Sequence, residues 1–288
     1  MISTISNGEI EISAKTSGAE LTSVKKISNG LEYLWQGDKE VWGRNAPVLF
    51  PIVGKVKNNT YQVDGREYSL PQHGFARDKD FELIEKTETL LSYSLKYSEE
   101  TLDVYPFKFE LLIQYELDKY ALTTRYIIKN LDNKEIYFSI GAHPGFICPI
   151  LPDENYSDYY LEFEKEEIQS MALLDNGLRN GKFKPVLNNE KIIPLSYELF
   201  KDDALIFKNL NSRIISLKSK RSGHGFHFSI QGFPYVGIWS KPGPFVCIEP
   251  WLGVADSIDS TGDFKNKEGI IKLPQDKSFD CEFSVVVF

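Results

Sequence analysis

The sequence has little cysteine and no long apolar run. Three cysteines among 288 residues, Cys148, Cys247 and Cys281, are odd in number and widely spaced. We therefore expect buried free thiols in a reducing cytoplasm and no disulfide framework. No stretch of about 18 apolar residues is present, so we expect no membrane-spanning segment. The N-terminus lacks a charged region followed by an apolar one, so we expect no signal peptide.

Basic residues are also fewer than acidic ones. The 33 Lys and Arg residues are outnumbered by 41 Asp and Glu residues, which gives a net charge of -8. No basic run offsets this balance, which argues against a nucleic-acid or anionic-membrane partner.

Several common site motifs are missing. The sequence contains no CxxC, HExxH, GxGxxG, P-loop or GxSxG pattern. His224 and His227 are three residues apart, so on a strand they face opposite sides and do not chelate one metal ion. We therefore expect no metal site.

What is present is a strong two-residue periodicity. Residues 107–117 alternate apolar and mostly polar side chains, and residues 91–97 and 279–287 repeat the pattern, as half-buried antiparallel strands do. The 15 Tyr and 19 Phe residues also favour sheets. Further strand candidates lie at residues 123–130, 135–142, 213–218, 226–231 and 235–239. The sequence therefore predicts an all-β protein, a large antiparallel two-sheet sandwich in one domain over residues 1–288.

Local signals are consistent with this prediction. Asp64-Gly65 predicts a two-residue hairpin, because both residues tolerate the positive φ angles of a type I′ turn. Helical periodicity is limited to single turns at residues 98–104 and 196–201.

The most suggestive stretch for chemistry is residues 245–251. We expect a short buried strand over residues 246–248 that presents Glu249 at its end, because Pro250 does not continue a central strand. Apolar neighbours and Trp251 would raise the carboxyl pKa toward neutrality, which suits a general base. The alternative is a strand-end glutamate paired with a surface lysine.

Three loops rich in Gly and Pro, at residues 44–56, 70–80 and 141–158, interrupt the strands, and function often lies in such loops. His73 and Arg77 lie four residues apart and both donate hydrogen bonds to ligand oxygens. The alternative for Arg77 is a pair with Asp78 or Asp80.

The other candidates are His143, Arg44 and Asp203. His143 follows an apolar strand and precedes a proline, a setting that suits an acid/base residue; a structural histidine is the alternative. For Arg44, the alternative is a cation at the rim of a core wall. For Asp203, which is adjacent to Asp202, the alternative is a turn or capping residue.

Four segments together resemble a known family. Arg44…Leu49-Phe50-Pro51, residues 72–77 (QHGFAR), residues 141–146 (GAHPGF) and residues 247–251 (CIEPW) occur in the order and at the spacing of the aldose 1-epimerase (galactose mutarotase-like) family. The similarity covers essentially the whole chain and is strongest to the LacX-type branch of small bacterial members.

This resemblance implies a galactose mutarotase-like supersandwich with an open groove for a small sugar substrate. It implies interconversion of the α and β anomers of an aldohexose without metal or organic cofactor. It also implies residue roles: Glu249 as general base, His143 as general acid, His73 as the second active-site histidine, Arg44 and Arg77 as sugar-contacting arginines, and Asp203 as a hydroxyl-binding residue. Larger galactose-specific members carry Asn-Arg where this chain has Arg44-Asn45, so the substrate preference of those members does not transfer.

The chemistry needs Glu249 ionised and His143 protonated, which predicts a bell-shaped pH dependence. We expect aromatic faces for the sugar ring from Trp251, Phe75, Trp239 and Tyr105.

A hexose-6-phosphate mutarotase is one alternative, with its anion site drawn from Arg44, Lys55, Lys57 and Arg77. A non-catalytic carbohydrate-binding module is another, and neither reading defines an oligomeric state.

Overall fold

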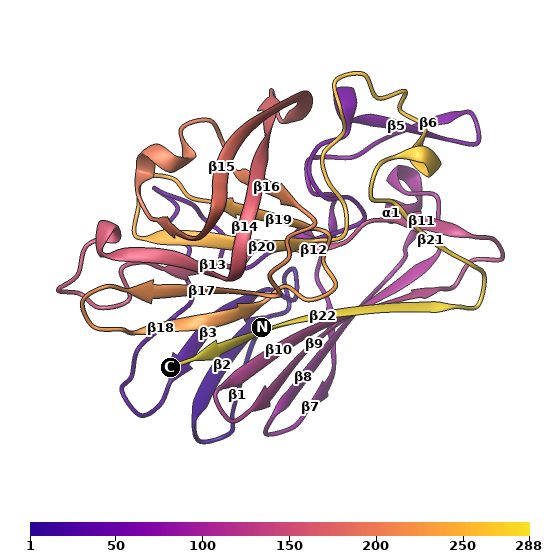
Figure 1. Cartoon of the computed structure of the whole chain (residues 1–288). Helices are drawn as coiled ribbons and strands as arrows, with labels where there is room; N and C mark the ends of the chain where they lie inside the picture. The colour runs from indigo at the N-terminus through magenta and orange to yellow at the C-terminus, as the bar shows by residue number, and fades with distance from the viewer.

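The computed structural model describes residues 1–288, which form mainly antiparallel strands (Figure 1). The largest sheet has nine strands. In spatial order they are β15 (Leu178–Pro194), β14 (Tyr159–Asp175), β17 (Ile214–Ser219), β18 (Gly225–Ser229), β22 (Ser278–Val287), β10 (Ala121–Asn130), β9 (Phe109–Asp118), β8 (Leu90–Lys96) and β7 (Glu82–Lys86).

A six-stranded sheet carries the site described below. It consists of β16 (Leu205–Lys208), β19 (Tyr235–Trp239), β20 (Phe245–Trp251), β12 (Gly141–Ala142) and β4 (Val48–Leu49), with β13 (Gly145–Ile147) also paired to β20. The strand β20 is its centre, because it pairs with β19 on one side and with β12 and β13 on the other.

Smaller elements complete the fold. They are the sheet β1 (Ile2–Ser6), β2 (Ile10–Lys15) and β3 (Leu21–Lys26), the hairpin β5 (Thr60–Val63) and β6 (Arg66–Ser69), the pair β11 (Ile136–Phe138) and β21 (Ile271–Leu273), the helix α1 (Glu99–Val104), and the 3₁₀ turns η1 (Lys57–Asn59), η2 (Ala76–Asp78), η3 (Tyr156–Asp158), η4 (Tyr197–Phe200) and η5 (Phe264–Asn266). Ser98 caps α1 in a capping box. No helix has the length and apolar character that crossing a membrane requires.

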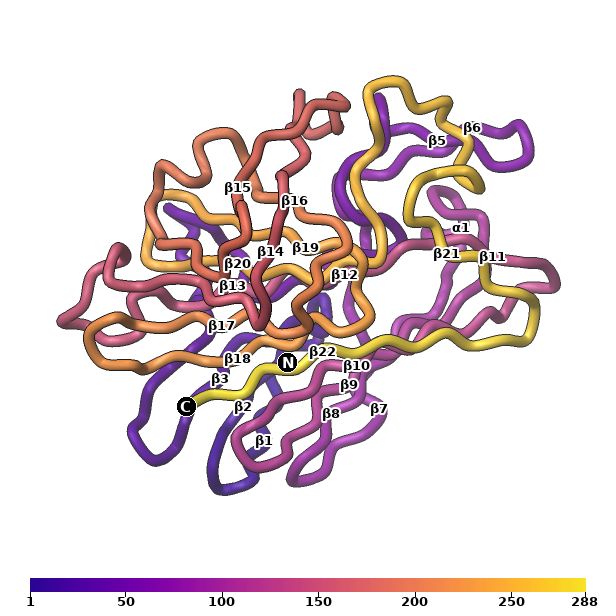
Figure 2. The backbone as a smooth tube through the Cα atoms, viewed as in Figure 1, coloured from indigo at the N-terminus to yellow at the C-terminus, as the bar shows by residue number.

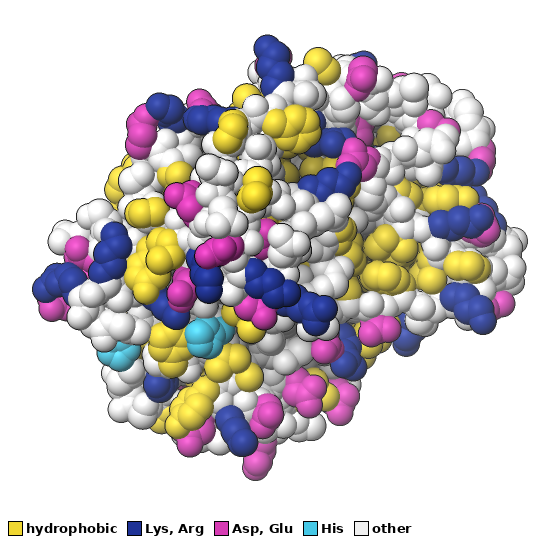
Figure 3. Space-filling view, in the orientation of Figure 1, with side chains coloured by type: hydrophobic (Ala, Val, Ile, Leu, Met, Phe, Trp, Pro, Cys, Tyr) yellow, Lys and Arg dark blue, Asp and Glu magenta, His cyan; other side chains and the backbone are white.

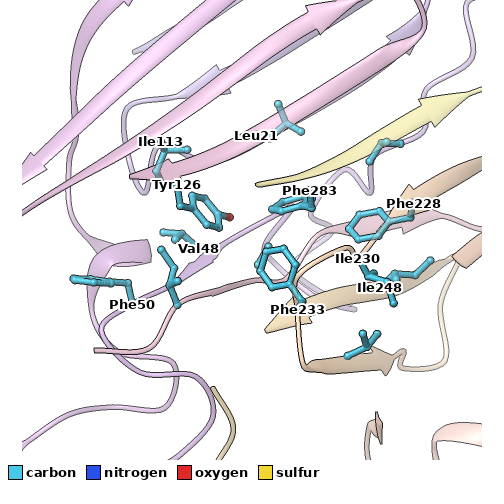
Figure 4. Packing of buried hydrophobic residues seen from close by; sticks show 14 of the residues in the cluster. Leu21, Val48, Phe50, Ile113, Tyr126, Phe228, Ile230, Phe233, Ile248 and Phe283 are labelled. Carbon is cyan, nitrogen blue, oxygen red and sulfur yellow. The ribbon is translucent and has the colours of Figure 1, made fainter. Parts of the chain in front are cut away.

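The core lies between the two large sheets. One cluster of 65 buried hydrophobic residues connects them. Figure 4 shows Phe228 of the nine-stranded sheet near Ile248 of β20, and Tyr126 of the same sheet near Val48 of β4. The predicted all-β sandwich of antiparallel sheets is confirmed.

The alternating segments are strands at nearly the predicted bounds. Residues 107–117, 91–97 and 279–287 correspond to β9, β8 and β22. The predicted hairpin is present, with φ of 52° at Asp64 and 78° at Gly65. The segment 135–142 is not one strand, because it divides into β11 and β12, which pair in different sheets.

The prediction that Pro250 ends its strand is wrong. The strand β20 continues through Pro250, which pairs with Val236 of β19. On the other side, β13 pairs only up to Cys247, and β12 pairs again at Trp251. Pro250 therefore lies opposite the break between β12 and β13, where no residue of either strand pairs with it, so a missing N–H is tolerated there.

Charges of both signs are interspersed over the surface shown in Figure 3. That face has no block of Lys and Arg side chains, in keeping with the acidic balance of the sequence.

Candidate active site

A cleft of about 300 Å³ opens on the outer face of the six-stranded sheet. All six residues that the sequence singled out line it: Arg44, His73, Arg77, His143, Asp203 and Glu249. The fold thus gathers residues from positions 44 to 249 around one cavity of the size that small ligands occupy.

Glu249 forms part of the cleft floor. Every residue of β20 is buried, and Glu249 is only 1% exposed. Its neighbour across the sheet is Gly237, and a Cβ there would lie 2.5 Å from the Trp251 ring, so the glycine leaves room for the indole. Burial raises the pKa of Glu249 well above its ordinary value; the nearby Trp251 indole offsets part of this rise, and the charge of Asp203 adds to it.

His143 lies directly against this carboxyl group. Its Nε2 is 3.2 Å from Glu249 Oε2. The loop between β12 and β13 holds it, the backbone N–H of His143 donates to Pro47, and the Trp42 ring stacks on the imidazole at 5.0 Å. Burial lowers the pKa of His143 to about 3, and the charges of Arg77 and Arg44 act in the same direction. The two groups are in contact at this distance, but they are not oriented to form a hydrogen bond, so Glu249 Oε2 stays unpartnered.

His73 is held in a defined tautomer by the backbone. The N–H of Gly54 donates to His73 Nδ1 at 3.1 Å, so in the neutral ring the proton is on Nε2. Burial lowers the pKa of His73 well below its ordinary value, which keeps the ring neutral. Its ring lies 5.7 Å from that of His143. The Nε2 atom of this neutral ring lies 3.3 Å from the side-chain amide of Gln72, which also lines the cleft.

The next glycine fixes the loop that carries His73. Gly74 has φ of 70°, and a Cβ there would meet the Phe50 carbonyl oxygen at 2.3 Å. The N–H groups of Phe75 and Ala76 both donate to that oxygen. A side chain at position 74 would clash with this backbone, so the loop needs a glycine there.

The two arginines share one carboxylate. Arg44 Nη2 lies 2.8 Å from Asp78 Oδ1, and Arg77 Nε lies 3.8 Å from Asp78 Oδ2. Arg77 also donates through Nη2 to the carbonyl of Gln72 at 2.7 Å. The pair with Asp78 considered for Arg77 is therefore present, and both guanidinium groups still line the cleft.

The structure separates the adjacent aspartates. Asp203, with φ of 86°, lines the cleft and accepts a hydrogen bond from the N–H of Ala204. Asp202 pairs with Lys184 at 2.6 Å and does not line the cleft. Asp203 is therefore the one available to a ligand.

The aromatic predictions are right for Trp239 and Trp251, which line the cleft, and wrong for Phe75 and Tyr105. The latter two belong to the hydrophobic core, where Tyr105 is fully buried. Sequence reasoning missed Trp42, which also lines the cleft. Its position two residues before Arg44 was the only available signal.

Four unpartnered polar atoms converge on this cleft. Five buried side-chain polar atoms in the protein have no hydrogen-bond partner, and four belong to cleft residues: Arg77 Nε, His143 Nδ1, Glu249 Oε2 and Trp251 Nε1. Buried groups of this kind call for an explanation, and a ligand that both donates and accepts hydrogen bonds is one.

The prediction that no set of metal ligands exists needs correction. The ligand atoms of His143, Cys247 and Glu249 lie within 4.8 Å of one another, so these residues could hold a metal ion. Sequence spacing did not reveal the set, because His143 comes from a distant loop.

A long hairpin, β14–β15, forms one wall of the cleft; we call it the arm (Figure 2). The strand β14 leaves β17 after Phe163, and beyond that point the two strands of the arm pair with each other, apart from one bridge between Arg179 and Ser257. The arm tip supplies Leu174 and Gly177 to the cleft. Arg179, just after the tip, donates through Nε to the Ala255 carbonyl and pairs with Glu268 at 2.7 Å.

We expect acid to loosen the docked arm. Burial raises the pKa of Glu268, but hydrogen bonds from Lys208 and Tyr235, together with Arg179, outweigh it and lower the pKa to about 2. Because the unfolded value is about 4.3, this carboxylate stabilises the docked arm above that pH, and the stabilisation is lost as pH falls through about 2.

Hydrogen exchange, corrected for intrinsic rates, measures this effect. Protection of the arm should fall relative to β9 between pH 4.5 and 2, and Glu268→Gln should remove this extra pH dependence. Glu282→Gln, which removes a carboxylate paired with Arg125 outside the arm, should leave it unchanged. An unaltered pH dependence in Glu268→Gln would contradict the assignment.

Comparison with known proteins agrees with this architecture. A family model described as Aldose 1-epimerase matches residues 1–272. The chain is 37% identical over 291 aligned positions to the chromosomal protein LacX of Lactococcus lactis subsp. lactis, and the match covers 96% of this chain and 97% of that protein.

Solved structures are similar over the full length. A galactose mutarotase related enzyme from Lactobacillus acidophilus superimposes with a TM-score of 0.96 at 37% identity, covering 100% of this chain and 97% of that one. A galactose mutarotase-like protein from Lactobacillus casei gives a TM-score of 0.93 at 31% identity and covers 100% of both chains. The chain belongs to the aldose 1-epimerase family.

Proposed function

We propose that the protein interconverts the α and β anomers of an aldohexose. The observation that carries this proposal is the pair His143 and Glu249, 3.2 Å apart on the floor of a cleft where other buried polar atoms also lack partners. A binding module needs hydrogen-bond donors and acceptors, but it does not need a carboxyl and an imidazole buried side by side.

The pair can supply both proton transfers that mutarotation requires. The step starts once a proton has passed from the Glu249 carboxyl to the His143 imidazole. Glu249 then takes the proton from the anomeric hydroxyl, and His143 gives a proton to the ring oxygen, so the C1–O5 bond breaks and an open-chain aldehyde forms. Rotation about C1–C2 presents the other face of the carbonyl to O5. Ring closure then reverses both transfers and restores the two side chains.

The remaining cleft residues would orient the sugar. His73 donates as a neutral group to the ring oxygen or a neighbouring hydroxyl, and Arg77 offers the unpartnered Nε–H. Asp203, which also lines the cleft, provides an acceptor. The indoles of Trp42, Trp239 and Trp251 offer apolar faces.

A hexose 6-phosphate is the second candidate substrate, because three cations line the cleft: Arg44, Arg77 and Lys241. Lys55 and Lys57, considered from the sequence, do not line it. Asp78 offsets one of the two arginine charges, and the Asp203 side chain lines the same cleft, which favours a neutral sugar. Lys241 has no carboxylate partner and lies over the Trp239 ring.

Polarimetry of freshly dissolved α-glucose, α-galactose and their 6-phosphates tests the proposal. We expect the protein to accelerate the approach to anomeric equilibrium of at least one neutral hexose above the buffer rate. Acceleration of the phosphates alone would assign the second candidate. No acceleration of any of the four, combined with measurable sugar binding, would replace the proposal with a binding function.

A further inference from the structure

The floor of the cleft brings a thiol next to the acid/base pair. Cys247 and Glu249 are two residues apart on β20, so their side chains lie on the same face of the sheet. Gly145 of β13 pairs with Cys247, and this pairing places the loop that carries His143 above the same face. Because His143 and Cys247 are far apart in the sequence, their proximity could not be predicted from the sequence.

The three groups match a known class of ligand set. A thiolate, an imidazole and a carboxylate together bind Zn²⁺ and its heavier analogue Cd²⁺, whereas Mg²⁺ prefers oxygen ligands alone. Bond lengths of about 2.0–2.3 Å in a tetrahedral site place ligand atoms roughly 3.3–3.8 Å apart. His143 Nε2 and Glu249 Oε2 are 3.2 Å apart, and all three ligand atoms lie within 4.8 Å of one another.

Independent observations also point to a ligand here. Glu249 is 1% exposed, and its Oε2 has no hydrogen-bond partner. His143 Nδ1 is likewise unpartnered. His143 and Glu249 line the cleft, whereas Cys247 lies fully buried beneath them. An ion that enters from the cleft would therefore meet the imidazole and carboxyl first and the sulfur last.

We propose that His143, Cys247 and Glu249 form an inhibitory site for a thiophilic divalent cation such as Zn²⁺ or Cd²⁺. On binding, the Cys247 S–H bond breaks, a metal–sulfur bond forms, and the proton leaves to solvent, with no change of oxidation state. The ion takes up the lone pairs of Glu249 and His143 that proton transfer to and from a sugar needs. A fourth coordination position faces the cleft. The inhibitory half of this proposal rests on the proposed function, whereas the binding half does not.

Binding is tested with Cd²⁺, whose bond to a thiolate gives an ultraviolet charge-transfer absorption. The full-length protein, first treated with a chelator, is titrated with CdCl₂ alongside Cys247→Ala, Cys148→Ala and Cys281→Ala. The last two are matched controls, because they remove the other two thiols. We expect the absorption in the wild type and both controls and its loss in Cys247→Ala. If Cys247→Ala retains the absorption, the proposal is overturned.

Glu249→Gln provides a second test if Cys247→Ala does not fold. It keeps the thiol but removes an anionic ligand, so the Cd²⁺ dissociation constant should rise by about 10-fold or more. An unchanged dissociation constant would remove Glu249 from the site and overturn the three-residue assignment.

Inhibition is tested by polarimetry with ZnCl₂, with MgCl₂ at the same concentration as control. Each protein is compared with its own metal-free rate. Chelator-treated wild type should remain active, Zn²⁺ should inhibit it and Mg²⁺ should not, and the inhibition constant should rise about 10-fold or more in Cys247→Ala. Equal inhibition of both proteins would overturn the metal site while leaving the mutarotase proposal intact. Activity lost on chelation and restored by Zn²⁺ would overturn the inhibitory role.

A further outcome separates the two proposals: the protein shows Cd²⁺ absorption that depends on Cys247, but it converts none of the sugars. It would support the binding site and reject the proposed function.

Discussion

Replacing Glu249 with Gln should lower kcat for mutarotation by about 10²–10⁴-fold, the usual contribution of a positioned acid or base. The amide is nearly isosteric with the carboxyl but does not accept the anomeric proton. Because burial raises the pKa of this carboxyl, the substitution also removes a buried ionisable group, and we expect a melting temperature equal to or above that of the wild type. Polarimetry and thermal denaturation on the same preparation measure both effects.

The matched control is Asp202→Asn. It makes the same kind of change at a carboxylate that pairs with Lys184 outside the cleft, so its kcat should equal that of the wild type. A Glu249→Gln protein with wild-type kcat would show that another residue is the base.

The two cleft histidines should differ in their kinetic effects. His143→Asn should lower kcat by a similar factor with little change in KM, because it removes an interaction used only in the transition state. His73→Asn should raise KM along with any fall in kcat, because a neutral donor to the bound sugar is lost. Asn also tolerates the φ of 68° at position 73, so the backbone is not strained by this change.

Steady-state kinetics on both variants, with circular dichroism to verify folding, measure the difference. The reverse pattern would exchange the two roles. Two silent variants would favour a carbohydrate-binding protein without catalysis.

The strands of the core could be predicted from the sequence because each buries one face. Residues 107–117 alternate cleanly, and the resulting β9 pairs in register with β10 over its whole length. The arm was missed for the same physical reason. Its strands pair with four register shifts, and β15 is largely exposed, so the two-residue period of residues 159–163 does not continue along the arm.

The site was predictable where a backbone constraint accompanied the functional residue. His73 precedes Gly74 and His143 precedes Pro144, and both loops line the cleft as expected. Aromatic residues were harder to assign, because the same residue type serves the core at Tyr105 and the cleft at Trp42. The contact between Cys247 and His143 depends on strand pairing between distant segments, so it could not be predicted from residue spacing along the chain.

Floor and wall of the cleft belong to elements that are joined to the rest of the fold in different ways. Glu249 lies on a fully buried central strand, whereas Leu174 and Gly177 come from an arm whose outer part pairs with no other strand. Insertions or deletions at the arm tip therefore change the shape of the cavity without disturbing the sandwich or the pair Glu249 and His143. In evolutionary terms, the shape of the cleft can diverge between relatives while the buried pair Glu249 and His143 stays in place.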